Sequence, residues 1–336
     1  MKIRRKKKVQ QLVCGLTLVL LAAGTLDGCR VGDTEVVLGR EFHREEVFRI
    51  NDESCSLAEA KVFLTNYQNI YGTVYGVNLW EHDFEENSLE QYVKDLTISQ
   101  LAQIISMDFL AQEQEISLTE EELLSVGEAA KAYYGSLSKA EIDYMDVDEA
   151  CIAKLYRQYG LANKLYASLT VGIDAEVSDD EARVMEARQI YVTSQEDAQA
   201  VEEGLRDKAD FLTMACTYNE AKTIDITFGR GELPPEVEKV AFALKKEEIS
   251  GKIAVEDGGY YFIECLNNYN PELTEANKQV ILERRRKESF DDVYDAFVTT
   301  LSSELNEELW DSVRVEASEE IQTDSFFETY SKYCTW

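Results

Sequence analysis

Proline is scarce in this sequence, with three in 336 residues. Because proline interrupts helices, its scarcity favours long helices over a loop-rich all-β fold. Histidine is rarer still, limited to His43 and His82, and no Cys-x-x-Cys or clustered Cys/His motif occurs. We therefore expect no metal site and no cofactor. A hydrolase is poorly supported, since two isolated histidines offer no recognisable Ser/His/Asp or Cys/His set.

Positive charge is also in short supply. Lysine and arginine total 34 against 65 aspartates and glutamates, which gives a formal net charge of −31. Such a surface repels phosphate backbones, so nucleic acid is not an expected partner. Hydrophobic residues make up an ordinary 45% of the chain, and global disorder is not indicated.

The N-terminus departs from this acidic balance. A basic segment up to Lys8 precedes an apolar run from Leu12 to Gly24, a length typical of a signal peptide. Leu26-Asp27-Gly28-Cys29 looks like a lipobox, although Asp27 departs from the usual uncharged residue. We predict a signal peptide over 1–28, lipidation of Cys29, and an extracytoplasmic chain attached to the membrane by a lipid anchor. The alternative is an uncleaved membrane anchor.

The other cysteines do not suggest a disulfide framework. Besides Cys14 and Cys29, five cysteines occur at wide and irregular spacing, at positions 55, 151, 216, 265 and 334. An odd number with such spacing favours buried free thiols.

The front of the chain reads as a polar tether over 29–45 followed by a helical module over 46–176. A strand is predicted at 46–50. Helices are predicted at 56–80, at 88–114, from a Ser117–Glu120 capping box onward, and at 148–169.

The middle of the chain changes in pattern. It predicts a short helix at 178–181, strands at 187–192 and 259–266, and helices at 195–208, 211–218 and 236–243. Two strands with helices between them indicate a compact α+β domain.

The back of the chain returns to a helical pattern, read as one helix over 274–310. We expect Val313 and Val315 to pair with the strand at 46–50, so that residues 274–317 rejoin the front module and 318–336 form a tail. The fold class is therefore α+β, with an α/β domain inserted into a mostly helical one.

Several short motifs of the middle domain resemble the parvulin family of prolyl isomerases. They are Ala187-Arg-Gln-Ile-Tyr-Val192, Ala209-Asp-Phe-Leu-Thr-Met-Ala215 with Tyr218-Asn-Glu220, Phe228-Gly-Arg-Gly-Glu-Leu233 and Gly259-Tyr-Tyr-Phe-Ile263. They occur in the family's order over 183–268. The tethered architecture, with this domain between helical segments, resembles envelope foldases of the PrsA and SurA type.

The resemblance implies a site for cis–trans isomerisation of X–Pro bonds without a cofactor. Phe228, Leu233 and Val237 fall where the family forms an apolar proline-binding cup. Gln189 and Tyr261 stand where the family has two histidines, and they are expected to keep a polar pair across adjacent strands. Glu220 lies beside Ala221, which occupies the place of an acidic or thiol residue. The three catalytic positions are thus Gln189, Glu220 and Tyr261, and we expect weak or absent turnover.

Two functions follow as hypotheses. The first is a foldase that binds unfolded or partly folded exported polypeptides and assists their folding. The alternative is a non-catalytic envelope lipoprotein that scaffolds one dedicated partner, with the aromatic tail from Phe326 to Trp336 as its docking segment. Formation of a homodimer is left open.

Overall fold

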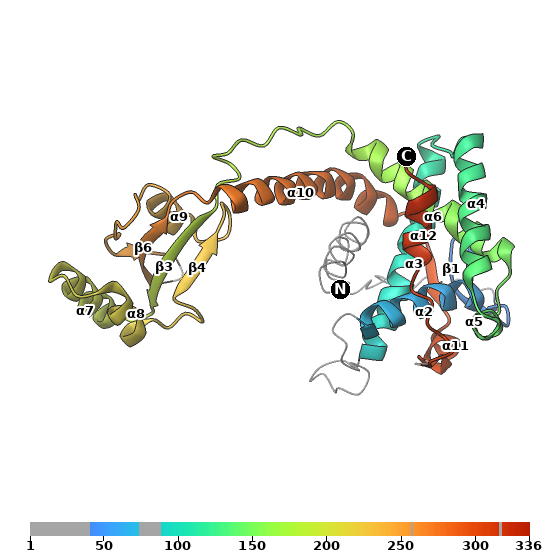
Figure 1. Ribbon diagram of the computed structural model, residues 1–336, viewed down its shortest axis with the longest axis horizontal. Helices are drawn as coiled ribbons and strands as arrows, with labels where there is room; N and C mark the ends of the chain where they lie inside the picture. The colour runs from blue at the N-terminus through green and yellow to red at the C-terminus, as the bar shows by residue number, and fades with distance from the viewer. Residues whose placement is uncertain (1–40, 74–88, 257, 316–317) are drawn as a thin grey trace, which may run out of the picture. The chain divides into compact units, whose positions relative to one another are not determined.

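The computed structural model describes residues 41–73, 89–256, 258–315 and 318–336 (Figure 1). The chain divides into two compact units, Met1–Gly172 with Ser289–Trp336, and Ile173–Glu288 between them. The α+β class, with one unit inserted into a mostly helical one, is confirmed. The predicted signal peptide, Cys29, His82 and the predicted end of the first helix lie outside the described residues.

The first unit combines helices with a small antiparallel sheet of order β2-β1-β7. Its strands are β1 (Glu46–Ile50), β2 (Glu53–Ser56) and β7 (Ser303–Leu305). Its helices are α2 (Leu57–Thr73), α3 (Leu89–Glu113), α4 (Glu120–Ser136), α5 (Lys139–Met145), α6 (Glu149–Thr170), α11 (Glu307–Ser312) and α12 (Phe326–Tyr333).

The predicted helix over 274–310 is wrong after residue 298. The helix α10 spans Pro271–Val298 and is followed by β7 and α11. The hydroxyls of Thr299 and Thr300 donate to the carbonyls of Ala296 and Phe297, at 2.8 and 2.7 Å, and this local bonding competes with helix continuation. The strand that pairs with β1 is therefore β7, with Phe48 opposite Leu305, and not the segment around Val313 and Val315.

Two predicted helix starts also need correction. The capping box of α4 is formed by Thr119 and Glu122, two residues after the predicted Ser117–Glu120. The Ser178–Glu181 segment is a turn and not a helix, although the Glu181 amide still donates to the Ser178 hydroxyl at 3.1 Å. A serine followed three residues later by a glutamate can satisfy unpaired backbone amides both at the start of a helix and in an isolated turn. The motif alone therefore does not distinguish a helix start from a turn.

The segment predicted as a tail is part of the core of the first unit. Phe326 is fully buried and Tyr330 is 5% exposed. The Phe326 ring lies 4.3 Å from that of Tyr156 and 5.3 Å from that of Tyr133, measured between centroids. An aromatic docking tail is therefore excluded for these buried side chains, while Trp336 remains 45% exposed.

The interior of the first unit also contains a buried carboxyl group, that of Asp108. Asp108 of α3 is 8% exposed, and its Oδ1 has no hydrogen-bond partner among the described residues. Burial raises the pKa of Asp108, partly offset by Arg157, and Glu53 raises it further. The folded state therefore holds this proton more tightly than the unfolded chain does.

We expect Asp108→Asn to stabilise the first unit at neutral and alkaline pH, by about 1 kcal/mol. A folded-state pKa raised above the unfolded value means that stability falls as pH rises through the folded pKa. The gain should therefore shrink as the pH is lowered and Asp108 becomes protonated. Urea unfolding of both proteins at pH 4, 6 and 8 checks this. A gain that is equal at all three values would show that charge is not the cause.

The inserted unit is built on an antiparallel sheet of order β4-β3-β6-β5. The strands are β3 (Met185–Val192), β4 (Asp225–Phe228), β5 (Ile253–Ala254) and β6 (Tyr260–Asn267). The helices are α7 (Gln195–Arg206), α8 (Phe211–Tyr218), α9 (Pro235–Ala241) and the first part of α10. One sheet face packs against α7 and α8, and the other against α9.

The five described cysteines are free. Cys55, Cys265 and Cys334 are buried and Cys151 is half-buried, as expected for structural thiols. Cys216 is exposed on α8, and the expectation that it is buried is wrong. Its helix packs through Phe211 and Ala215, which leaves the position after Ala215 facing solvent.

Candidate functional site

All the predicted site residues except Glu220 gather on one face of the β3–β6 sheet. Alternation along a strand places every second side chain on the same face. Phe228 and Val237 belong to one core cluster, and Leu233 and Tyr261 pack against its edge. Gln189 shares this face because it lies two residues from Tyr191, which pairs directly with Tyr261.

The three positions of the predicted apolar cup differ in access. Val237 is fully buried and Phe228 is 3% exposed, with its ring 5.4 Å from that of Phe242. Leu233 is half-buried, and its amide donates to Glu238 Oε1 at 3.0 Å. Phe228 and Val237 thus form the floor of the face, and Leu233 is the member that a ligand can reach.

Gln189 holds a loop in place. Its Nε2 donates to the Thr223 carbonyl at 3.0 Å, and its backbone amide donates to the Ile224 carbonyl at 2.9 Å. Its partner across the sheet is Ile263. Gln189 is thus bonded to the loop that precedes β4, and its polar pairing with Tyr261 stays a prediction.

Asn219 reinforces the same loop and was not identified from the sequence. Its Oδ1 accepts the Tyr191 amide at 2.9 Å, and its Nδ2 donates to the carbonyls of Ala221 and Thr223 at 3.0 and 3.2 Å. An asparagine side chain readily forms hydrogen bonds with nearby backbone in turns. The position of Asn219 directly after a predicted helix was therefore the signal for such a role.

Tyr261 forms an aromatic pair with Tyr191. Their ring centroids are 4.7 Å apart and the planes are inclined by 44°. The Tyr191 ring also lies over Gly259, where an added Cβ would come within 2.3 Å of it. Glycine at 259 is thus required by this close approach, and both rings are half-buried. The pair continues the apolar face beyond the cup.

Glu220 lies beside the end of β3, where its carboxylate accepts hydrogen bonds. Its Oε2 accepts the Thr193 hydroxyl at 2.9 Å and its Oε1 accepts the Thr193 amide at 3.2 Å, while its own amide donates to the Tyr191 carbonyl. The carboxylate is exposed. The carboxylate fixes the start of the loop that follows α8, and it does not point toward the apolar cup.

The resulting surface is suited to contact rather than to proton transfer. Glutamine carries no titratable proton, and a phenol ionises only in alkaline solution. The face can bury an apolar or ring-shaped group against Leu233 and the two tyrosines. A twisted amide placed there would meet few polar partners.

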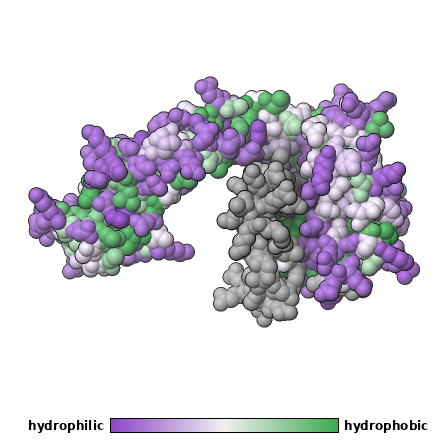
Figure 2. Space-filling model, viewed as in Figure 1, coloured by the Kyte–Doolittle hydropathy of each residue, from purple (hydrophilic) through white to green (hydrophobic). Residues whose placement is uncertain are grey.

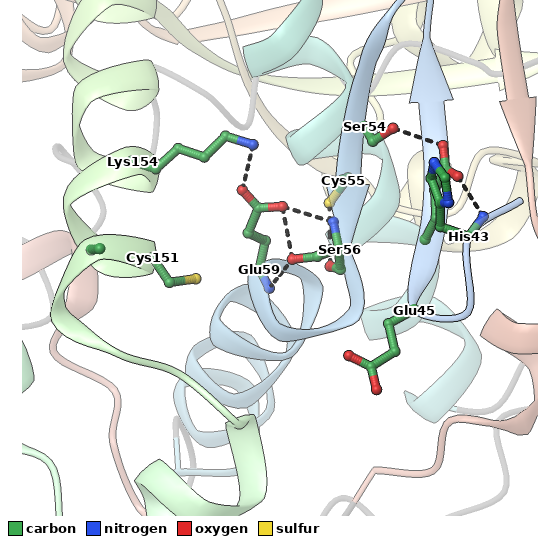
Figure 3. A pocket seen from close by; sticks show the side chains of 10 residues that line it. His43, Glu45, Ser54, Cys55, Ser56, Glu59, Cys151 and Lys154 are labelled. Carbon is green, nitrogen blue, oxygen red and sulfur yellow. Dashed lines mark hydrogen bonds and ion pairs between the residues drawn. The ribbon is translucent and has the colours of Figure 1, made fainter.

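A second hollow lies in the first unit (Figure 3), with a volume of about 500 Å³. Lys154 Nζ bridges Glu53 Oε1 at 2.9 Å and Glu59 Oε1 at 2.8 Å, and Glu59 Oε2 accepts the Ser56 amide at 2.7 Å. Burial raises the pKa of the Cys151 thiol in its wall to about 12, so this thiol is not activated. These groups already satisfy one another, and we assign no chemistry to this hollow.

Across residues 41–73, 89–256, 258–315 and 318–336, no three or more potential metal ligands come together. Within the same ranges, no helix has the length and hydropathy needed to cross a bilayer.

Comparisons with known proteins find likeness only among solved structures. No protein-family model and no curated protein matches the chain. The chain is similar to a peptidylprolyl isomerase (PrsA) from Bacillus anthracis, at 19% identity over 60% of this chain and 96% of that one, with a TM-score of 0.37. It is similar to PrsA from Bacillus cereus at 16% identity, with coverage of 74% and 97% and a TM-score of 0.39.

A third likeness is to NmPin, the parvulin of Nitrosopumilus maritimus. The identity is 24% over 25% of this chain and 97% of that one, and the TM-score is 0.23. With identities and TM-scores this low, the case for function rests on the residues of this chain.

Proposed function

We propose that the chain is an extracytoplasmic foldase of the PrsA type, which binds unfolded exported polypeptides and has little or no isomerase turnover. The observation that carries this proposal is the altered centre of the inserted unit. The apolar face of Phe228, Leu233 and Val237 is assembled, whereas Gln189 is bonded to the Thr223 carbonyl and Tyr261 is paired with Tyr191.

Binding without turnover follows from what each group supplies. Rotation about an X–Pro bond faces a barrier of about 18–20 kcal/mol because amide resonance is lost. Lowering it requires an apolar seat and polar groups that favour the twisted amide. Here the seat persists while the two central positions are committed to other contacts. The surface therefore supports retention of apolar and proline-containing segments more than their isomerisation.

The dedicated-scaffold alternative loses one of its supports. Phe326 and Tyr330, which the sequence offered as docking residues, are buried in the first unit. General binding of unfolded chains needs no such dedicated segment.

We expect the purified chain to suppress aggregation of several unrelated unfolded proteins. X–Pro isomerisation should stay as slow as the uncatalysed reaction, which takes on the order of tens to hundreds of seconds. Leu233→Asp should weaken the protection, because a charge at the accessible edge of the apolar face opposes burial of client residues. Light scattering and a protease-coupled peptide assay measure the two activities.

Leu124→Asp is the matched control, since Leu124 is 71% exposed on α4 in the other unit. It introduces the same charge and should leave protection unchanged. Rapid turnover by the unaltered chain would show that Gln189, Glu220 and Tyr261 form a working site. Protection of no client at all would favour the scaffold.

A further inference from the structure

The strand β4 forms an open edge of the sheet in the inserted unit. It is the outermost strand on the β3 side of the sheet (Figure 1). The Gln189 amide donates to the Ile224 carbonyl just before β4 begins, and the same register continues along the strand. In an antiparallel ladder, the backbone groups of alternate residues face the same neighbour. Those of Ile226 therefore face β3, whereas those of Asp225 and Thr227 point away from it.

The outward groups of β4 can bond to another chain. Within the described part of this chain, no hydrogen bond from another segment reaches the backbone of Asp225 or Thr227. Both residues are exposed. Their amides and carbonyls stand in a row with the spacing of a strand, and such a row is a template for an extended polypeptide.

The two sides of this edge differ in chemistry. Because side chains alternate along a strand, Ile226 lies on the side of the apolar face, where it packs against the same cluster as Leu233. Asp225 lies on the opposite side, with its Oδ1 3.1 Å from Arg188 Nε. Arg188 Nη1 in turn lies 3.2 Å from Glu264 Oε2. The charges of this row alternate in sign across β6, β3 and β4, so the next position beyond Asp225 is complementary to a lysine or arginine.

We propose that an extended segment of a client polypeptide joins β4 as a further antiparallel strand. Its backbone bonds to Asp225 and Thr227, its apolar side chains lie beside Ile226, and a basic side chain on its other side pairs with Asp225. The inference rests on the proposed foldase function and adds the class of segment bound, in which apolar residues alternate with basic or polar ones. In the view of Figure 2, hydrophobic and hydrophilic residues likewise lie side by side on the inserted unit.

A second copy of the chain is a poor occupant of the same edge. Each copy has a formal net charge of −31, and its β4, of sequence DITF, offers no basic side chain. An unfolded client has an unpaired backbone and can supply lysine or arginine. Because the edge offers the outward groups of two residues, the hydrogen bonds are few and the client can be released again.

Two N-methylated peptides test the strand pairing on the unaltered protein. Both are short peptides of alternating valine and lysine, methylated either on the lysine amides or on the valine amides. In the antiparallel arrangement the lysines lie opposite Asp225 and Thr227 and exchange hydrogen bonds with them. Methylation of the lysine amides should therefore weaken binding about tenfold, as expected for the loss of two hydrogen bonds, and methylation of the valine amides should not.

Fluorescence anisotropy of the labelled peptides measures the two affinities. The peptides carry equal charge, so general attraction to an acidic surface affects both alike. Equal affinities would overturn the proposal, as would a loss confined to the valine amides.

Thr227→Pro tests the edge itself. Proline removes an outward donor and is tolerated where the amide of an edge strand faces solvent, so the pairing of β3 with β4 is kept. The variant should bind the unmethylated peptide about tenfold more weakly. Ser303→Pro is the matched control, because Ser303 is exposed on β7 of the first unit and its amide points away from β1. It should bind the peptide as the unaltered chain does, and equal losses for both variants would overturn the assignment to β4.

The aggregation assay separates failure of this inference from failure of the proposed function. If the unaltered chain protects clients and Thr227→Pro protects them equally well, the foldase function stands and the β4 edge is not its binding site. If the unaltered chain protects no client, the proposed function itself fails.

Discussion

Phe326→Ala is expected to destabilise the first unit by about 3–5 kcal/mol, the usual cost of removing a fully buried phenylalanine. Phe326 packs against the rings of Phe63, Tyr133 and Tyr156, with centroids 4.3–5.3 Å away. Its backbone is fixed as well, because its amide donates to Asn66 Oδ1 and its carbonyl accepts the Tyr156 hydroxyl. The cavity left by alanine therefore opens in a rigid surround that cannot collapse to fill it.

Tryptophan fluorescence during urea unfolding measures this effect selectively. The three tryptophans, at positions 80, 310 and 336, all fall outside the inserted segment Ile173–Glu288. Tyr333→Ala on the same helix is the matched control, since Tyr333 is 41% exposed and its loss should change stability by less than about 0.5 kcal/mol. Equal losses for both variants would contradict the central place of Phe326.

Cys29→Ser is expected to abolish attachment of lipid and to stop cleavage before position 29. The thiol is the only group in Leu26-Asp27-Gly28-Cys29 that can carry a thioether-linked lipid, and serine cannot replace it. Fatty-acid labelling and mass spectrometry of the chain check the result. Cys14→Ser, in the apolar run of the same segment, is the control and should leave labelling intact.

The same experiment separates the lipoprotein from the uncleaved anchor. If the unaltered chain takes up no label and keeps residues 1–28, the apolar run is the anchor and the lipidation hypothesis fails. Asp27→Ala should increase processing if the charge two positions before the cysteine slows recognition. No change on removing that charge would show that Asp27 is tolerated.

Local signals in the sequence predicted much of the fold. The helix predicted at 211–218 matches α8, and the structure shows that Asp210 caps its start and Asn219 its end. The start of α2 followed from Ser56 and Glu59, whose reciprocal bonds are present. Such signals act within one turn, which is why they survive without knowledge of the tertiary structure.

Features fixed by distant contacts were missed. β7 has three exposed residues and no strand pattern of its own, and it exists because β1 offers an unpaired edge. β4 was likewise not predicted, since Asp225–Phe228 becomes a strand only beside β3. Pairing partners far along the chain decide these short strands, and local preference does not.

The site shows the same division. The motif order predicted a cup from Phe228, Leu233 and Val237, and in the structure these residues belong to or pack against one core cluster, as does Tyr261. The partners of Gln189 were not predictable, because they depend on how the loop at 219–224 crosses the end of β3. Tyr191 was missed as a partner of Tyr261, since only the register of β3 and β6 brings the two rings together.

The first unit is assembled from two separate parts of the chain, so its two parts are synthesised at different times. The Phe326 amide donates to Asn66, which lies 260 residues earlier in the sequence. The strand β1 pairs with β7 across a similar separation. An emerging polypeptide can complete the inserted unit while the front helices still lack their last partners. Contacts over such separations form slowly, because a long loop must close first. Until the final helix is made, Phe63, Tyr133 and Tyr156 of the front helices lack the Phe326 ring that they pack against in the finished unit.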